Sequence, residues 1–511
     1  MKENQSGNKD VLKINPQSYW IASTNKTNYP ELKEDINVDV AIVGGGMVGI
    51  TTGFLLKKEG LKVAVLEADG ILQDTTGHTT AKITSQHDLI YSHIKSQMGI
   101  DKARLYAEAN EFAIKTIAGL VEERNIDCDF HWQPAYIYTQ SNEYVQKIID
   151  ETKTAIELGI TAEYVEDLPL PFPIKAGLRF DNQAEFHPRK YLLSLAKDIP
   201  GDGSHIFENT KAVDIKQGQS PTVITRDGKK VMASHVIVAS HYPFYDMPGL
   251  YFTRIYPDRS YVLGITMKDK FPKGMFINAE TPTRSLRAQR QGNKEIVLIG
   301  GEHHKTGHGK STVVHYENLR DFAYATFQVE DILYRWSTQD CMTLDGVPYI
   351  GQLAASTDNI YVATGFGKWG MTNSTVSAIL LKDLIVGKEN PWASLYDPSR
   401  FTPMASATNF IVQNTDVAIN FVAGKLSPSS LGKDIEKNEA KVIDIDGKKV
   451  GAYCDAKGDM HFVDTTCTHL GCETKWNDAE ATWDCPCHGS RYSPEGDVVE
   501  GPTVKPLNKI K

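Results

Sequence analysis

The stretch VDVAIVGGGMVG, Val38 to Gly49, sets the architecture of most of the chain. A short apolar run leads directly into GGGMVG, where Gly44, Gly46 and Gly49 have the spacing GxGxxG. Glycine at these positions permits a tight turn, close approach of the backbone to a pyrophosphate, and close packing of helix on strand. The pattern predicts a strand, a glycine turn and a helix that runs to about Glu59.

A second strand is predicted over Lys62 to Glu67, and it ends in an acidic residue 23 positions after Gly44. An acid at this distance is placed to accept hydrogen bonds from a ribose, so the region reads as a dinucleotide-binding unit. Val40 to Leu56 is also a run of 17 uncharged residues, which raises the alternative of a membrane span. The run is shorter than the ~20 apolar residues that a span needs and is rich in Gly and Thr. We therefore expect a buried strand and helix and no transmembrane segment.

Three later segments indicate which dinucleotide binds. They are TTGHTTAK (Thr75 to Lys82), TLDGVPYIG (Thr343 to Gly351) and IYVATGFGKWGMTNS (Ile360 to Ser374). Together with the glycine turn, they resemble the D-amino-acid oxidase and sarcosine oxidase superfamily of flavoproteins, over about Val38 to Leu395. Outside the glycine turn and these three segments, no further GxGxxG follows a strand, so a separate nicotinamide domain is not visible. The resemblance implies FAD as the cofactor.

The resemblance also implies which residues contact FAD. They belong to the glycine turn, the acid at the end of the second strand, TTGHTTAK, a middle strand and the late glycine segment. These residues are Gly44, Gly46, Gly49, Glu67, Thr76, Val213, Gly365, Phe366, Gly367, Gly370 and Met371.

His78 and Lys82 are the predicted catalytic residues. In the sarcosine oxidase relatives, a histidine and an arginine four residues apart sit beside the flavin, and His78 and Lys82 fall on these positions. A cation near the ring would favour the anionic reduced flavin. The alternative is that His78 only caps its loop, since histidine has many structural roles. His78 also falls where dimethylglycine dehydrogenases attach FAD covalently, so covalent attachment is a further hypothesis.

The chain departs from the amino-acid-oxidising members where they clamp a substrate carboxylate. The matching positions hold Ser85 and Thr372. Neutral hydroxyls are weaker carboxylate partners than charged donors, so a simple amino acid is in doubt as the substrate. The covalent cysteine of the sarcosine oxidases is missing, and the nearby Cys341 is expected to be a small buried residue.

The segment GGEHHKTGHG contains Glu302, His303, His304 and His308, which could suggest a metal site. Adjacent histidines commonly point apart, however, and the glycines suggest a loop that lines the substrate cavity. Both interpretations remain open from the sequence, and the loop is favoured.

Two strings near the C-terminus, CTHLGC (Cys467 to Cys472) and CPCHGS (Cys485 to Ser490), form a second constellation. Each string supplies two cysteines and one histidine. The histidine lies between the cysteines in the first string and after them in the second. A structural zinc site would also accept sulfur and nitrogen ligands, but zinc needs only four of the six side chains. A plain disulfide would leave both histidines unexplained.

The strings resemble Rieske proteins of the cytochrome bc type, over about the last seventy residues. The resemblance implies a [2Fe-2S] cluster with one iron on Cys467 and Cys485 and the other on His469 and His488. It leaves Cys472 and Cys487 to form a disulfide that ties the two cluster loops together.

Further residues match the same family. Ser490 and Tyr492 stand where hydroxyl donors stabilise the reduced cluster and so raise its potential, and Gly501 and Pro502 fit the loop that covers the cluster. The two histidine ligands are expected at an exposed tip, from which electrons pass to a partner. Rieske oxygenases need an additional mononuclear iron site, for which the chain offers no convincing set.

The predicted fold class is an α/β FAD-binding (Rossmann-like) domain with an α+β substrate domain, plus a small all-β Rieske domain. The predicted order is an N-terminal lead over 1–36, the FAD-dependent oxidoreductase domain over 37–398, a helix and linker over 399–438, and the Rieske domain over 439–511. Within the oxidoreductase domain, the FAD-binding parts are about 37–95, 165–245 and 340–398, and the substrate-domain parts are about 96–164 and 246–339.

The segment between the domains is predicted to be an amphipathic helix, Asn409 to Gly424, with Phe410, Val417 and Phe421 on one face. We expect this face to dock between domains rather than to anchor the protein in a membrane. Ser427 to Ser430 has the composition of a linker.

Composition bounds the function. The 511 residues include 41 % hydrophobic and 23 % charged residues, as in ordinary soluble proteins, and the net charge of −9 disfavours nucleic acid as a partner. The N-terminus has neither an apolar core nor a twin arginine, so a cytoplasmic location is expected. The favoured hypothesis is a FAD-dependent dehydrogenase of a small molecule, best guessed as an amine. Electrons would pass through the Rieske cluster to an unknown one-electron acceptor.

Two alternatives to this function remain open from the sequence. One is a redox sensor or electron carrier, and the other is an oxidase that uses oxygen directly.

Overall fold

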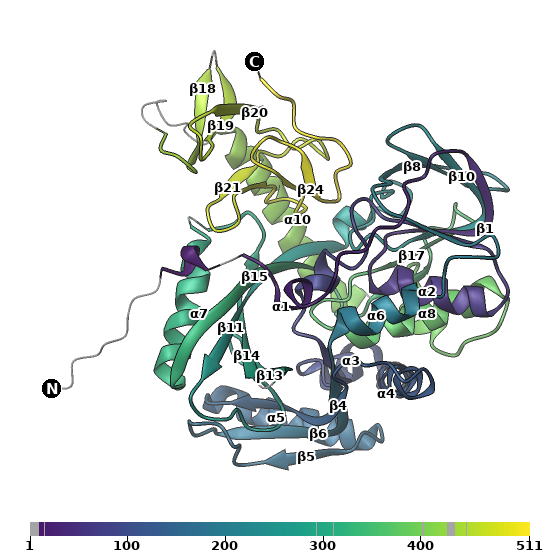
Figure 1. The fold of residues 1–511 in the computed structure, drawn as a ribbon. Coiled ribbons are helices and arrows are strands. Elements are labelled where there is room, and N and C mark those ends of the chain that lie inside the picture. Colours follow the sequence, from purple (N-terminus) through teal and green to yellow (C-terminus); the bar gives the residue numbers. More distant parts are fainter. Residues whose placement is uncertain are drawn as a thin grey trace.

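The computed structural model describes residues 10–14, 16–292, 294–309, 311–400, 403–426, 435–445 and 447–510. Two large sheets lie side by side, and a smaller body of short strands from the C-terminal part sits against both (Figure 1). The predicted linker Ser427 to Ser430 lies outside the described residues.

The first sheet has the spatial strand order β16-β17-β10-β1-β2-β7, with β9 paired to β10 and β8 paired to β9. Neighbouring strands from β17 to β7 run parallel. The predicted strands on either side of the glycine turn are β1 and β2, which are direct neighbours. The strands are β1 (Ile36–Val43), β2 (Val63–Leu66), β7 (His205–Phe207), β8 (Ala212–Lys216), β9 (Thr222–Thr225), β10 (Lys230–Val238), β16 (Tyr349–Gln352) and β17 (Ile360–Thr364).

The glycine turn joins β1 to the helix α2 (Met47–Lys58) at the carboxyl end of the sheet. Gly44 has φ +114°, and a β-carbon there would overlap the carbonyl of Ala239. A β-carbon at Gly49 would overlap the carbonyl oxygen of Gly44. The turn therefore requires glycine at both positions, because only glycine tolerates this backbone conformation and this close approach.

Helices pack around the first sheet and hold the N-terminal lead in place. α2 packs against α8 and α6. In the lead, Trp20 is fully buried and its Nε1 donates to the carbonyl of Thr79 at 2.6 Å, which ties the lead to TTGHTTAK. The elements are α1 (Tyr19–Ala22), η2 (Thr75–His78), α6 (Pro188–Ala196), α8 (Gly370–Ile385) and α9 (Ala393–Tyr396).

The second sheet has nine strands in the order β15-β11-β14-β13-β12-β4-β6-β3, with β5 paired to β6. β11 and β15 are its longest members and pair antiparallel along their whole length. The strands are β3 (Lys82–Ile83), β4 (His131–Thr139), β5 (Ala162–Val165), β6 (Ala176–Glu185), β11 (Ile255–Met267), β12 (Met275–Asn278), β13 (Arg284–Gln291), β14 (Lys294–Lys305) and β15 (Val329–Thr343).

Helices also flank this second sheet. Its two longest helices are α4 (Ile100–Glu123) and α5 (Asn142–Glu157). The remaining elements of this part are η1 (Val11–Lys13), α3 (Ile90–Met98), η3 (Tyr251–Thr253) and α7 (Val313–Thr326).

The C-terminal part consists of one long helix and two small antiparallel sheets, β18-β19-β20 and β21-β22-β23-β24. The predicted fold class is confirmed in all three parts. None of the helices in the described ranges is both long and apolar enough to cross a bilayer. The elements are α10 (Pro403–Leu426), β18 (Ala440–Ile445), β19 (Lys448–Cys454), β20 (Met460–Asp464), β21 (Lys475–Asn477), β22 (Thr482–Asp484), β23 (Arg491–Tyr492) and β24 (Val498–Glu500).

α10 is longer than the predicted helix and does not bury the predicted face. Val417 packs against the small sheets, but Phe410 and Phe421 are 44 % and 41 % exposed. The expectation of a docking face was therefore wrong for both phenylalanines. Polar side chains of α10 make the contacts instead: Asn414 donates to the carbonyl of Thr253, and Asp416 pairs with Lys305.

Candidate functional site

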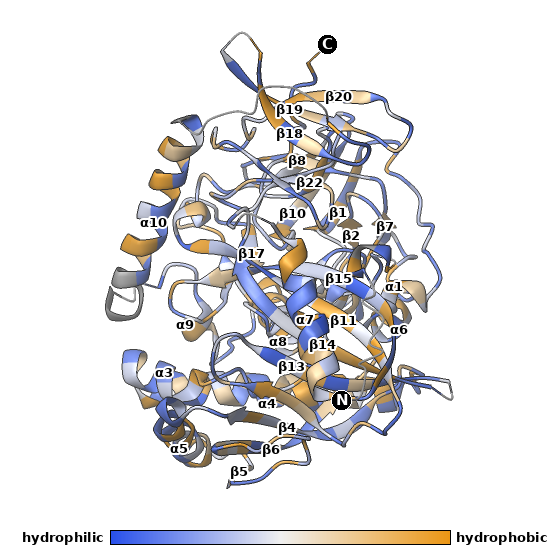
Figure 2. Cartoon of the chain, turned by 90° about the vertical axis from the view of Figure 1, so that its left-hand side faces the viewer, coloured by the Kyte–Doolittle hydropathy of each residue, from blue (hydrophilic) through white to orange (hydrophobic). Residues whose placement is uncertain are grey.

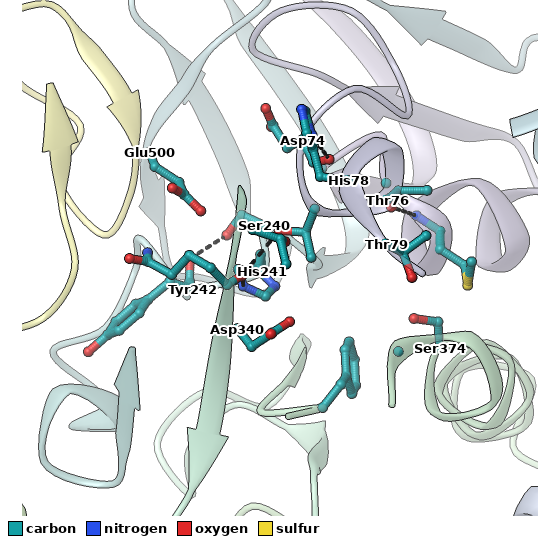
Figure 3. A pocket seen from close by; sticks show the side chains of 18 of the residues that line it. Asp74, Thr76, His78, Thr79, Ser240, His241, Tyr242, Asp340, Ser374 and Glu500 are labelled. Atoms are coloured by element: carbon teal, nitrogen blue, oxygen red, sulfur yellow. Dashed lines mark hydrogen bonds between the residues drawn. The ribbon is translucent and has the colours of Figure 1, made fainter. Parts of the chain in front are cut away.

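A cavity of about 300 Å³ lies between the two large sheets, at the carboxyl end of the first (Figure 3). Most of the residues predicted to contact FAD line it, together with both predicted catalytic residues. Gly49, Val213 and Gly365 do not, although Ala212, next to Val213, does. The predicted residues that line the cavity are Gly44, Gly46, Glu67, Thr76, His78, Lys82, Phe366, Gly367, Gly370 and Met371.

Two side chains, those of Glu67 and Thr76, accept hydrogen bonds from the backbone of the glycine turn and hold it in place. The Glu67 carboxylate accepts hydrogen bonds from the backbone of Gly45 at 2.7 Å and of Asp69 at 3.1 Å. Thr76 Oγ1 accepts from the backbone of Met47 at 3.1 Å. Burial raises the pKa of Glu67, because the charged form loses its hydration. The acid at the end of β2 therefore lies at the turn and bonds to its backbone, and the predicted contact with a ribose stays a prediction.

His78 and Lys82 both face the cavity but make different contacts. His78 Nδ1 lies 2.8 Å from the carbonyl oxygen of Asp74, so the side chain also caps its own turn, and burial lowers the pKa of its imidazole. Lys82 Nζ donates to Ser285 Oγ at 2.7 Å and lies 5.7 Å from the centroid of Trp369. Burial lowers the pKa of Lys82 to about 8. Lys82 is thus a buried base that can change its charge near physiological pH.

A second lysine in the cavity wall was not singled out from the sequence. Lys368 Nζ lies 3.0 Å from Asp258, 3.4 Å from Asp340 and 2.9 Å from Ser260 Oγ. Burial opposes its charge, but the two carboxylates raise the pKa of Lys368 overall. Its place in the late glycine segment was the available signal. Nothing in the local sequence links it to Asp258, which lies on β11.

The two cluster strings form neighbouring loops, one between β20 and β21 and the other between β22 and β23. The thiols of Cys467 and Cys485 are buried. The rings of His469 and His488 lie 5.0 Å apart, centroid to centroid, and nearly perpendicular. The loops thus bring together the four predicted ligands, which come from two separate strings.

Cys472 and Cys487 form a disulfide between these loops, with their Cα atoms 6.5 Å apart. Among the described residues, the group of metal-capable side chains with ligand atoms within 4.8 Å of one another is Cys472, Cys485 and Cys487. Two of these sulfurs belong to the disulfide and offer no thiolate, so the trio is not a metal site of its own.

Two family models match the chain. The model for FAD dependent oxidoreductases matches residues 39–384, and the model for the Rieske [2Fe-2S] domain matches residues 428–511. The protein belongs to the FAD dependent oxidoreductase family and carries a Rieske domain. Members of the family bind FAD, and the Rieske domain binds a [2Fe-2S] cluster.

Similar proteins agree with this assignment. The Rieske 2Fe-2S iron-sulfur protein YhfW of Bacillus subtilis is 47 % identical over 98 % of this chain and 99 % of its own. The gamma-glutamylputrescine oxidoreductase of Escherichia coli is 24 % identical, over 77 % of this chain and 92 % of its own. Glycine oxidase from Geobacillus kaustophilus shares the fold, with a TM-score of 0.61 and 18 % identity over 71 % of this chain and 99 % of its own.

The residues present fit both groups. At the flavin site, Gly44, Gly46 and the first residues of α2 line the cavity, and the two glycines present no side chain to it, so the backbone of the turn can approach a phosphate closely. At the Rieske site, His469 Nδ1 is buried and has no hydrogen-bond partner among the described residues. A buried nitrogen without a partner is costly, and a metal bond would satisfy it. The Tyr492 hydroxyl lies 3.2 Å from Cys467 Sγ, within reach to donate to a ligand thiolate.

The Rieske domain also forms part of the flavin cavity. Val498, Val499, Glu500, Gly501, Thr503 and Val504 line the cavity together with the glycine turn. Figure 3 shows Glu500 entering from the Rieske side, opposite Ser240 and Asp74. Burial, and then the neighbouring charges of Glu67 and Glu500, raise the pKa of Asp74 well above its usual range. No sequence motif indicated this contact.

Gln339 on β15 bridges the cavity and the cluster loop. Its backbone carbonyl accepts from His241 Nε2 at 2.9 Å, and both residues line the cavity. Its side chain donates to the carbonyl of Gly489, the residue after His488, at 3.0 Å, and accepts from Thr306 Oγ1 at 2.7 Å. Gln339 is buried, so these bonds are shielded from water.

The predicted exposure of the histidine tip was wrong for His488, whereas His469 is half-buried. His488 is only 3 % exposed. The ring of Phe252, on η3, lies 5.8 Å from the ring of His488 and 6.5 Å from that of His469. α10 covers the same region, because the Cys487 sulfur lies 3.9 Å from the carbonyl of Val417. The tip is covered because the Rieske domain is packed with these loops toward the flavin part of the chain.

The histidines of GGEHHKTGHG separate, as the alternation of a strand requires. The segment up to Lys305 is strand β14 rather than a loop. His303 lines the cavity, whereas His304 stacks on His315 with centroids 4.2 Å apart. His308 Nε2 lies 3.4 Å from the carbonyl of Pro486 in the cluster loop. The histidines therefore do not form one metal site.

Ser85 and Thr372 lie away from the cavity wall. The Ser85 hydroxyl donates to Glu111 at 2.6 Å, and that of Thr372 donates to the carbonyl of Thr84 at 3.1 Å. Both hydroxyls are used inside the fold, and neither is free for a carboxylate. Cys341 is fully buried, as expected.

Proposed function

We propose that the protein is a FAD-dependent dehydrogenase that oxidises a small amine-like molecule and releases the electrons through its Rieske domain to a one-electron acceptor. The observation that carries the proposal is the shared cavity, because residues 498–504 of the Rieske domain line the same cavity as the glycine turn. When bound, FAD accepts two electrons from a substrate, and a [2Fe-2S] cluster carries one at a time.

The proposal assigns the cluster to Cys467, His469, Cys485 and His488, and the flavin to the glycine turn and the late glycine segment. A continuous route of bonds joins the two places. It runs from His488 to the Gly489 carbonyl, through the hydrogen bond to the side chain of Gln339, and along Gln339 to its own carbonyl and His241. Such a buried, hydrogen-bonded route keeps the donor and acceptor in a fixed relative position.

The substrate class rests on the chemistry of the cavity wall and on the relatives. Tyr261, Trp369 and Val262 supply apolar surface, and Lys82 and the Lys368–Asp340 pair supply charge. Of Lys82 and Lys368, only Lys368 has carboxylates within ion-pair distance among the described residues. Lys82 is therefore able to polarise a bound group. Relatives named for gamma-glutamylputrescine and glycine support an amine-like substrate.

The test is an anaerobic screen of amines against the holoprotein, with flavin absorbance and the electron paramagnetic resonance signal of the reduced cluster followed together. We expect the correct amine to bleach the flavin and the cluster signal to appear afterwards. In Gln339→Leu the cluster signal should appear at least about tenfold later, because the hydrogen bond to Gly489 is lost, with flavin bleaching unchanged. Gln352→Leu, an exposed glutamine on β16, is the matched control.

Two results would contradict the proposal. One is flavin bleaching with a cluster that stays oxidised. The other is full turnover with oxygen, with an unchanged peroxide yield, in His488→Ala, which would identify an oxidase whose Rieske domain is structural.

A further inference from the structure

The helix α10 presents its apolar side to the outside and its polar side to the protein (Figure 2). The side chains that face the protein include Gln413, Asp416 and Asn420, which are half-buried. The outward apolar side chains are Ile411, Val412, Ile419 and Val422, which are 66 %, 55 %, 59 % and 57 % exposed. A surface helix normally has the opposite arrangement, so this face needs an explanation.

The outward residues form one continuous stripe. At about 100° per residue, Ile411, Val412, Ile419 and Val422 fall within an arc of roughly 100°. The half-exposed Phe410 and Phe421 extend the apolar surface beyond one margin of this arc, on the far side of Asn414. From Phe410 to Ala423 the sequence contains one charged residue, Asp416, and it faces inward to pair with Lys305. The stripe is therefore free of charge, and it is apolar except for the exposed Thr415 near its middle.

The lack of charge and the size of the stripe indicate what can cover it. Soluble electron-transfer partners are typically steered by charged patches, which the stripe lacks. A second copy of the chain would need about 800 Å² per partner for a stable dimer, whereas half the surface of a helix this long offers roughly 400 Å². A bilayer requires no matching partner surface and takes up an uncharged apolar helix face directly.

We propose that α10 is an interfacial helix that lies on a lipid bilayer, with Ile411, Val412, Ile419 and Val422 entering the acyl boundary. Its inward polar side chains are already satisfied by the protein, as Asn414 is by the carbonyl of Thr253, and do not need to reach the headgroups. The protein lies on the membrane and does not cross it.

The stripe continues to the cluster loop. The ring of Phe421 lies next to Gly471 in this loop: its Cε2 is 3.8 Å from the position that a β-carbon on Gly471 would take. Leu470, beside His469 in the same loop, is 43 % exposed. The bilayer therefore meets the side of the molecule that carries the first cluster loop. Electrons leaving through His469 would leave at the bilayer surface, a consequence that rests on the proposed function, whereas the lipid contact itself does not.

The test is flotation of the holoprotein with vesicles of phosphatidylcholine. We expect the wild type to float with them, and Ile419→Asp/Val422→Asp to partition at least about tenfold less, because each added carboxylate would have to be desolvated. Ile156→Asp is the matched control: this isoleucine on α5 is 54 % exposed and should float like the wild type. Because the net charge is −9, vesicles of phosphatidylglycerol should bind the protein less at low salt, and added salt should reduce the difference.

Three results would overturn the proposal. The first is wild-type protein that does not float with either kind of vesicle. The second is equal flotation of the wild type and Ile419→Asp/Val422→Asp. The third is a dimer in analytical ultracentrifugation without lipid that the double substitution dissociates, which would assign the stripe to a second copy. Cluster and flavin absorbance, measured in each variant, show that the protein remains folded, and neither readout depends on a substrate.

Discussion

Lys82 combines burial with a position in the cavity wall, and its charge therefore depends on pH. Because burial lowers its pKa to about 8, Lys82 is protonated below that pH and neutral above it. In the role proposed for Lys82, a cation at this position would favour electron uptake by a bound flavin, so we expect activity that depends on it to be present at low pH and lost as the pH rises through about 8.

The first prediction concerns this loss of activity at alkaline pH, the alkaline limb of the pH profile. We expect the rate constant for flavin reduction, measured anaerobically by stopped flow, to fall above about pH 8 in the wild type. In Lys82→Arg the limb should move above the measurable range, because the guanidinium stays charged. In Lys82→Met the rate should be about tenfold to a hundredfold lower throughout, with no limb. A limb that persists in Lys82→Met would belong to the substrate amine instead.

Single residues also show where local patterns stop being informative. Glu67 was indicated by its characteristic distance from the glycine turn, and Thr76 by the resemblance of its segment to the flavoprotein family; in the structure, both side chains accept hydrogen bonds from the turn. Lys368 could not, since its partners Asp258 and Asp340 are brought to it by the pairing of β11 with β15. The exposure of His488 was wrong because it depends on Phe252, far away in the sequence.

Among the elements, α2 and α4 show how differently two helices tolerate a methyl group. A β-carbon at Gly49 in α2 would overlap the Gly44 carbonyl, whereas one at Gly119 in α4 would meet no atom within 4 Å. The same glycine-to-alanine change should therefore have opposite effects.

The second prediction compares these two substitutions. Gly49→Ala should lower the free energy of unfolding by about 3 kcal/mol and reduce the FAD retained on purification, because helix and strand are forced apart at the phosphate turn. Gly119→Ala should raise the free energy of unfolding by about 1 kcal/mol, through the higher helix propensity of alanine. Denaturant titration and the ratio of flavin to protein absorbance measure both effects. Equal FAD content in the two variants would argue against a phosphate site at the turn.

α10 illustrates an element whose existence, but not its orientation, could be predicted. The spacing of Phe410, Val417 and Phe421 indicated a helix, and the helix is present. The apolar pattern was read as a buried face, which is the usual case. The structure instead uses Asp416, Asn414 and Gly424 as the inner face, because Lys305, Thr253 and Glu473 lie opposite them.

At the scale of the whole molecule, buried charges hold the Rieske domain against the rest of the chain. Arg259 on β11 is buried, pairs with Glu500 at 3.2 Å and donates to Ser337 at 2.7 Å. Arg491 binds the same Glu500 carboxylate at 3.2 Å. Because this network joins the two parts at the edge of the cavity, the cluster loops are expected to stay docked during turnover.

The third prediction tests this docking. Arg259→Leu should lower the free energy of unfolding by about 3 kcal/mol, because the half-buried Glu500 carboxylate loses one of its two arginine partners. The radius of gyration from small-angle X-ray scattering should rise as the domain separates. Arg104→Leu is the control: it breaks an exposed pair with Asp101 and should change the stability by no more than about 0.5 kcal/mol. An unchanged radius of gyration in Arg259→Leu would show that other contacts suffice for docking.

By itself, the sequence determined the two cofactor types, the glycine turn, the cluster strings and the three-part fold class. The glycine turn and each cluster string depend on residues a few positions apart, so short-range backbone geometry indicates them, whereas the cofactor types and the fold class rest on the resemblance of these segments to known families. The tertiary structure alone decided that residues 498–504 close the flavin cavity, that Gln339 links it to Gly489, and that α10 turns its apolar stripe outward. These features depend on which distant surfaces pack together, and that is set by the burial and pairing of side chains across the whole chain rather than by any local spacing.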